Sequence, residues 1–186
     1  MRHKSAFVAF LLAPSIALAA TCSVPEFETF AAVANSASEP ESVLVEMQPV
    51  ATLRVPSGFA KIGILPNGSL GLGQHPKNIS AVLGFETKES VAVHKKGAKP
   101  AAFMLSIFKG LNAVGCRYLQ GYQLETQDYR LHGNLGGGAE LFAYGKGDRH
   151  QFYLIRTDKP DFVLSGLFRN IDRAGFEAIL STLIIK

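Results

Sequence analysis

Residues 140–168 read ELFAYGKGDRHQFYLIRTDKPDFVLSGLF, and this stretch decides the fold. Three runs within it, 140–144, 151–157 and 162–168, are rich in aromatic and branched apolar residues, which is typical of β-strands. The segments between the runs are rich in the Gly, Pro and Asp that tight turns favour. Strands joined by such short turns run antiparallel, so the stretch predicts a three-stranded β-meander.

Two helices are predicted around this meander. Downstream, Asn170 is expected to cap a helix with Asp172 in its first turn, and apolar residues at 176, 179, 180 and 183 form its buried stripe. Upstream, Pro100 is typical of a helix start, and apolar residues recur at helical spacing as far as position 111.

The chain between residues 51 and 83 predicts further strands. Residues 51–55 alternate between apolar and polar, and residues 79–83 form another short apolar run. Ile62 and Ile64 should face Leu70 and Leu72 across a turn that contains Asn-Gly, the strongest short hairpin signal. The segments 86–94 and 112–138 follow no clear pattern, and the glycine-rich stretch 133–138 is expected to be a flexible loop.

These elements predict an α+β fold in a single domain, because 186 residues supply one core. An antiparallel sheet with a C-terminal β-meander is expected to pack against a central and a C-terminal helix. Residues 48–186 would form this domain. Residues 20–47 would form an N-terminal helix, over 24–34, and an acidic linker.

The first 19 residues have the pattern of a cleaved export signal. Arg2 and Lys4 precede a short apolar segment, and Ala17 and Ala19 are small residues at the positions that a signal peptidase reads. Cleavage after Ala19 is therefore predicted, with a periplasmic or secreted location and no transmembrane segment left afterwards. A lipoprotein anchored at Cys22 is not favoured, because Ala19 and Thr21 do not fit a lipobox.

Cys22 and Cys116 are the two cysteines of the chain. In an exported domain such a pair usually forms one disulfide, which would join the mature N-terminus to the middle of the chain. The alternative is that Cys116 is a nucleophile assisted by His132, with Asn134 or Asp128. No helix start or catalytic motif surrounds Cys116, so the disulfide is favoured.

Charge is divided unevenly along the chain. Residues 20–50 hold five acidic and no basic residues, whereas residues 51–186 hold 17 basic and 10 acidic residues. The acidic arm is therefore expected to lie near the basic body. Without Arg2 and Lys4 the net charge falls from +4 to +2, and no basic-aromatic motif is present, so nucleic acid is not an expected partner.

The densest basic region lies around Lys95, Lys96 and Lys99. A solvated face is one interpretation of these lysines, and a contact surface for an acidic protein partner is the other. The tyrosines at 118, 122 and 129 could stack on a sugar, but packing in the core is favoured.

Catalytic and metal-binding motifs are weak. The histidines are far apart and no local spacing brings two ligands together, so no metal site and no cofactor are predicted. The glycine-rich stretch lacks the Gly-Lys-Ser/Thr ending of a phosphate loop. A hydrolase site would have to be assembled from distant residues, such as His132 with Asp148 or Glu140.

The order of the predicted elements resembles that of the exported PsbP-like α/β/α sandwich proteins. A first strand that ends in Pro56-Ser57-Gly58-Phe59 is followed by a hairpin, a central helix, a three-stranded meander and a closing helix. The resemblance covers about residues 48–185. It implies an accessory or partner-binding role, which some exported toxin-immunity proteins of similar shape also have, and it implies no catalytic residues.

The sequence therefore favours an exported, non-catalytic protein that binds a partner in the cell envelope, as a toxin inhibitor (immunity protein) or as an accessory factor. A small hydrolase is the alternative from a different class. A third hypothesis is a binder of a small apolar ligand, held between the sheet and the helix at 100–111.

Overall fold

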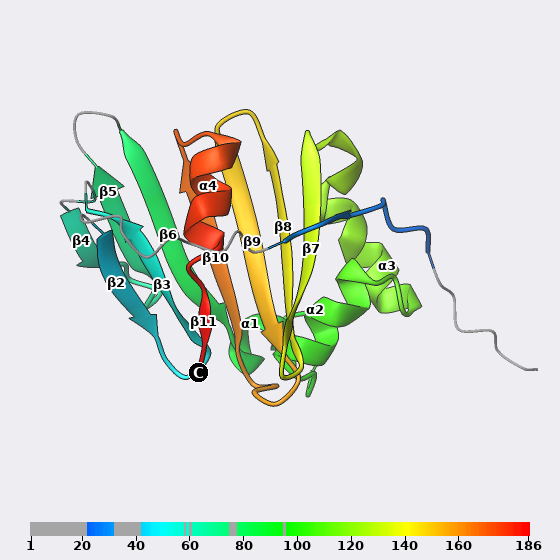
Figure 1. The fold of residues 1–186 in the computed structure, drawn as a ribbon. Coiled ribbons are helices and arrows are strands. Elements are labelled where there is room, and N and C mark those ends of the chain that lie inside the picture. Colours follow the sequence, from blue (N-terminus) through cyan, green and yellow to red (C-terminus); the bar gives the residue numbers. More distant parts are fainter. Residues whose placement is uncertain (1–21, 32–41, 58, 60, 75–77, 95) are drawn as a thin grey trace, which may run out of the picture.

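The computed structural model describes residues 22–31, 42–57, 59, 61–74, 78–94 and 96–186. These residues form a main sheet of eight strands and a second sheet of three, with α-helices on both faces of the main sheet (Figure 1). The strands are β1 (Glu28–Thr29), β2 (Ser42–Met47), β3 (Ala51–Pro56), β4 (Lys61–Ile64), β5 (Leu70–Gln74), β6 (Ile79–Glu86), β7 (Tyr129–Gly136), β8 (Ala139–Lys146), β9 (Arg149–Arg156), β10 (Val163–Arg169) and β11 (Ile184–Ile185). The helices are α1 (Lys88–Ala92), α2 (Pro100–Phe108), α3 (Ala113–Leu119) and α4 (Arg173–Leu180), with 3₁₀ turns η1 (Gln120–Tyr122) and η2 (Leu124–Thr126).

The predicted α+β fold and its C-terminal β-meander are confirmed. Strands β8, β9 and β10 are antiparallel neighbours in the middle of the main sheet, whose order is β1-β7-β8-β9-β10-β6-β5-β4. The hairpin β4–β5 is also confirmed, with Ile62 opposite Leu72 and Ile64 opposite Leu70. Short turns therefore set the register of both regions, as the sequence indicated.

The main sheet is covered on both faces, which gives three layers. On the front face in Figure 1 lie α4 and the small sheet, whose order is β11-β3-β2. Leu141 and Phe152 point into this front core together with Leu53 of β3 and Phe176 of α4. On the rear face α1, α2 and α3 form a separate core, into which Phe142 of β8 points. Alternate residues of one strand thus serve two different cores.

Both predicted helices are present, with adjusted ends. Helix α2 begins with Pro100 as its first helical residue and ends at Phe108. Helix α4 is capped by Asp172, whose carboxylate accepts a hydrogen bond from the backbone N–H of Gly175 at 2.7 Å, and not by Asn170 as predicted. Asn170 instead takes a left-handed conformation with φ of 59°, which turns the chain out of β10.

The predicted N-terminal helix over 24–34 is wrong for its described part, residues 24–31. These residues are extended, and β1 pairs in parallel with the edge of β7. The N–H of Phe30 donates to the carbonyl oxygen of His132 at 2.8 Å, and Nε of Arg130 donates to the carbonyl oxygen of Glu26 at 3.1 Å. Short helices are marginal alone, so an open sheet edge offers these residues better hydrogen bonding.

Two further predictions are corrected. The acidic linker was expected to reach residue 47, but residues 42–47 form β2, which pairs with β3. The glycine-rich stretch 133–138 is not a flexible loop, because it continues β7 as far as Gly136 and then turns at Gly137 and Gly138 into β8. These two turn glycines have φ of 57° and 77°, a conformation that favours glycine.

Arg156 ties three chain segments together at the end of β9. Its buried guanidinium donates to the carbonyl oxygen of Val50 at 2.7 Å, to that of Lys186, and to the carboxylate of Asp158. The turn between β2 and β3 and the C-terminus are therefore fixed to the main sheet. A buried charge is tolerated here because its donors are satisfied.

Gly166 on β10 allows the aromatic side chains of the front core to pack against the sheet. A Cβ atom at this position would lie 2.1 Å from Cε1 of Phe152, which is fully buried. We predict that Gly166→Ala lowers the free energy of unfolding by about 1–3 kcal/mol, as measured by urea denaturation, because the core would be overpacked.

Gly63→Ala is the matched control for this prediction. A Cβ atom at position 63 would meet nothing within 4 Å. Its free energy of unfolding should stay within about 0.5 kcal/mol of the wild-type value. Equal effects of the two substitutions would contradict the packing described for Phe152.

Candidate functional site

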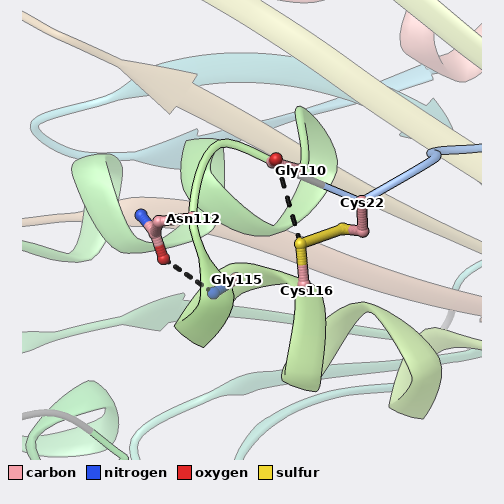
Figure 2. The surroundings of a disulfide bond; sticks show 5 residues. All are labelled: Cys22, Gly110, Asn112, Gly115 and Cys116. Carbon is pink, nitrogen blue, oxygen red and sulfur yellow. Dashed lines mark hydrogen bonds between the residues drawn. A yellow bond between two sulfur atoms is a disulfide. The ribbon is translucent and has the colours of Figure 1, made fainter. Parts of the chain in front are cut away.

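The disulfide fixes the N-terminal strand to the rear helices. Figure 2 shows Cys22 bonded to Cys116 in the middle of α3, and the two Cα atoms are 5.6 Å apart. The pair predicted from the sequence is therefore present. In the chain-entropy account, closing a loop with a sequence separation of 94 residues contributes up to about 4–5 kcal/mol. Because its sulfur is in this bond, Cys116 is not the nucleophile considered above.

Local residue choices position this corner. The side chain of Asn112 caps α3 by accepting a hydrogen bond from the N–H of Gly115 at 2.9 Å (Figure 2). A Cβ atom on Gly115 would lie 2.0 Å from the carbonyl oxygen of Ser106, so only glycine lets α3 approach α2 this closely. Gly110, with φ of 58°, lies directly against Cys22 in the same way.

A carboxylate with two hydrogen-bond partners, a lysine and a histidine, lies next to this corner. Oε1 of Glu140 is 2.8 Å from Nζ of Lys109 at the end of α2, and Oε2 is 3.0 Å from Nε2 of His132 on β7. Burial raises the pKa of Glu140, but the hydrogen bonds from Lys109 and His132 outweigh burial and leave this pKa below its usual value of 4.5. The cluster therefore links α2 to two strands of the main sheet.

This cluster bears on the hydrolase hypothesis. The structure brings His132 to Glu140, as one form of that hypothesis required, whereas Asp148 lies at the other end of β8, in its turn to β9. Both oxygens of Glu140 already have partners, Lys109 and His132, and the ring of His132 stacks on Phe142 at 4.6 Å. The geometry fits a structural ion cluster better than a general base that needs a free oxygen.

The predicted lysine surface is partly described. Lys95 lies outside the described residues. Lys96 lies in the turn before α2, Lys99 is the residue that precedes α2, and both are exposed. Together they line a hollow of about 300 Å³ between α2 and α3. The structure places these two cations together, and their role as a partner contact stays a prediction.

The three tyrosines singled out in the sequence do not form one strip. Tyr129 belongs to the front core, where the guanidinium of Arg173 lies 4.3 Å from its ring centre. Tyr118 and Tyr122 pack against the rear core. Core packing is therefore the correct interpretation for these rings, although Tyr122 also lines a second hollow together with Tyr144 and Tyr153.

This second hollow, here named the tyrosine hollow, has a volume of about 470 Å³. It lies between the η1–η2 segment and strands β8 and β9, and its lining includes Lys146 and Arg149. The sequence analysis did not single out these residues. The turn at Gly147 and Asp148 does place Lys146 opposite Arg149, so counting back from that turn could have found the pair.

Strand β4 is the last strand of the main sheet, and no other described strand pairs with its outer edge. All four of its residues are exposed, with 57% of Ile62 and 81% of Ile64 accessible. Large apolar side chains on an unpaired strand edge are uncommon, because such an edge can pair with another chain. This edge is therefore a candidate interaction surface.

The expected contact between the acidic arm and the basic body is observed for Glu28. Its carboxylate is 2.7 Å from the guanidinium of Arg173 at the start of α4. Glu39 and Glu41 lie outside the described residues. The N-terminal strand is therefore held to the body by an ion pair as well as by the disulfide and by β-pairing.

No helix among the described residues is long and apolar enough to cross a membrane. Within the same ranges, no three His, Cys, Asp or Glu side chains gather as a metal site would require.

We predict that Glu140→Gln lowers the free energy of unfolding by about 1 kcal/mol at pH 7, because a neutral amide cannot replace the carboxylate that pairs with Lys109 and hydrogen-bonds to His132. The pKa of Glu140 is lowered in the folded state. Its stabilisation is therefore complete above the unfolded value and is lost as the pH falls through the folded one. Denaturation curves between pH 7 and 3 should show the difference from wild type shrinking below about pH 4.5.

Glu125→Gln is the control, because Glu125 is an exposed residue of η2. This substitution should change the free energy of unfolding by less than about 0.5 kcal/mol at each pH. If Glu140→Gln had the same effect at pH 3 as at pH 7, the ion cluster would not be the source of the stabilisation.

No protein family matches this chain, and no match was found among curated proteins or among solved structures. The resemblance to the PsbP-like proteins therefore stays a prediction.

Proposed function

We propose that this chain is an exported protein that binds an extended, acidic segment of a partner protein along strand β4. The observation that carries the proposal is the open edge of β4, where exposed backbone and apolar side chains occur together. The partner would be a toxin or an envelope protein, so the chain would act as an inhibitor (immunity protein) or as an accessory factor.

The hydrogen-bonding pattern of the hairpin defines what this edge offers. The N–H of Leu65 donates to the carbonyl oxygen of Ser69 at 2.8 Å, so this pair is hydrogen-bonded. Bonded and non-bonded pairs alternate along an antiparallel ladder. Gly63 therefore bonds to β5, whereas Ile62 and Ile64 direct their N–H and C=O groups away from it. The backbone of Ile62 and Ile64 would therefore offer a partner strand two N–H donors and two C=O acceptors.

Side chains add an apolar component to this edge. Ile62 and Ile64 lie on the same face of the hairpin as Leu70 and Leu72, which adjoin or belong to the front core. An added strand with alternating apolar residues would extend this core outward by one strand. Main-chain bonds would give affinity and the apolar positions would give selectivity, as in other cases of strand addition.

Charge favours a different protein as the occupant over a second copy of this chain. Residues 20–186 carry 17 basic and 15 acidic residues, a net charge of +2, so two copies repel each other slightly. An acidic partner would be attracted to the same body and would associate faster.

Export is supported by the disulfide and by the sequence of residues 1–19. A disulfide-bonded pair is compatible with a periplasmic or secreted protein, because the cytosol keeps thiols reduced. The cleavage site after Ala19 lies outside the described residues and belongs to the proposal.

The proposal is tested by introducing a photo-crosslinking amino acid at position 64 in cells of the source organism. We expect one protein other than this chain to be captured, and we expect its crosslinked peptide to come from an extended, acidic segment. Position 93 is the control, since Val93 is 83% exposed and Ile64 is 81% exposed. The partner should be captured from position 64 and not from position 93.

Ile64→Pro provides the second arm, because proline removes the outward N–H and leaves the bonds between β4 and β5 in place. The variant should fold and lose the partner. The proposal fails if the products from positions 64 and 93 are the same, if position 64 captures only a second copy of this chain or nothing, or if a folded Ile64→Pro variant keeps the partner.

A further inference from the structure

We propose that the tyrosine hollow binds a small acidic sugar, meaning a sugar ring that carries a carboxylate. This site lies on the rear face over β8 and β9, separated from β4 by β10, β6 and β5. The inference does not depend on the function proposed for β4. The volume of the tyrosine hollow, about 470 Å³, falls in the range of small-molecule sites.

A row of three cations crosses the sheet, and two of them, Lys146 and Arg149, line this hollow. Lys146 on β8 is paired with Arg149 on β9, and Arg149 is paired with Arg169 on β10. All three residues are exposed, and directly opposed residues of an antiparallel sheet project from the same face. Neighbouring strands are only about 4.8 Å apart, so these like charges repel one another.

Nearby acidic groups do not neutralise this row. None of its three cations forms an ion pair with a described carboxylate. Asp148 precedes Arg149 in the turn, Asp128 contacts that turn, and Glu86 at the end of β6 lies near enough to contribute to the raised pKa of Tyr122 and Tyr153. The carboxylate of Asp128 accepts the N–H of Gly147 at 2.7 Å, and Asp148 is exposed in the turn. A bound anion would relieve the repulsion, which points to a negatively charged ligand.

The wall of the hollow next to the cations is a network of neutral hydrogen-bonding groups. The hydroxyl of Tyr144 donates to Oε1 of Gln151 at 3.0 Å, and Nε2 of Gln151 donates to the hydroxyl oxygen of Tyr153 at 2.5 Å. Burial raises the pKa of Tyr122 to about 12, and burial also raises the pKa of Tyr144 and Tyr153. All three hydroxyls are therefore protonated at neutral pH and can both donate and accept hydrogen bonds.

The rim opposite the strands is held in a strained conformation. Gln123, between η1 and η2, has φ of 49° and ψ of 41°, which is uncommon for a residue with a Cβ atom. Thr126 and Gln127 both donate to its carbonyl oxygen, at 3.0 and 3.3 Å, and so hold it in place. Strain of this kind is concentrated at ligand sites.

These features together select the ligand class. Tyrosine hydroxyls and glutamine amides match the hydroxyl groups of a sugar. The cation row matches a carboxylate, which arginine binds with paired hydrogen bonds. A purely apolar ligand would remove water from the nearby cations without offering them a new partner, so a charged, polar ligand fits this hollow better.

The test is an NMR titration of the ¹⁵N-labelled protein with D-glucuronate, D-galacturonate and N-acetylneuraminate. We expect at least one of them to shift the amides of residues 121–127, 144–146 and 149–153 saturably, with a Kd of about 1 mM or below. D-glucose tests the need for the carboxylate, and sulfate tests whether any anion suffices. Both should bind at least about tenfold more weakly, because a bond to a charged group is lost or the hydroxyl groups are missing.

Arg149→Gln should weaken binding of the acidic sugar about tenfold or more. Lys96→Gln, which removes an exposed cation elsewhere, and Ile64→Pro, which alters the β4 edge, should both leave it unchanged. The inference is overturned if none of the three acidic sugars binds, if glucose or sulfate binds equally well, or if the shifts lie outside the hollow. If no partner binds at β4, the results expected from this titration do not change.

Discussion

Strands β8 and β9 carry large apolar side chains on both faces, and neither face can be left in contact with water. Phe142, Tyr144, Tyr153 and Ile155 point to the rear, whereas Leu141 and Phe152 point to the front. Each such side chain contributes about 1.5–3 kcal/mol when it is buried. Two covering layers are therefore required. The small sheet with α4 supplies the front layer, helices α1 to α3 supply the rear layer, and the disulfide at Cys22 fixes the N-terminal strand beside the rear helices.

The surfaces with functional potential lie where this covering ends. Strand β4 is the last strand of the main sheet, and its isoleucines are exposed. On the rear face a hollow lies between the η1–η2 segment and strands β8 and β9, and Lys146 and Arg149 line it. One surface offers unpaired backbone and apolar groups, and the other offers charge and hydroxyl groups. The two surfaces suit different ligands, an extended peptide and a small anion.

The parts of the fold that the sequence predicted are those in which local signals agree with tertiary contacts. The meander, the hairpin at 62–72 and the two main helices have strong turn or capping residues. The N-terminal segment was mispredicted because Phe27 and Phe30 are three residues apart, which suggests one face of a helix. In the extended chain the two rings pack on opposite faces of the sheet instead, Phe27 against Phe142 and Phe30 in the front core.

Contacts between residues far apart in the sequence are shown by no local pattern. Tertiary contacts of this kind bring Glu140 to His132 and Lys109, and strand pairing creates the cation row.

Amide hydrogen exchange, resolved residue by residue, tests the central claim directly. The claim is that the middle of the main sheet is covered on both faces, whereas the outer edge of β4 is not hydrogen-bonded. The amides of Leu141, Phe142, Tyr153 and Leu154 should exchange slowest, because opening them exposes both cores. Along β4, the amide of Gly63 should be protected by its bond to β5, whereas those of Ile62 and Ile64 should exchange far faster. Equal protection at positions 62, 63 and 64, or exchange in β8 and β9 as fast as at Ile64, would contradict this account.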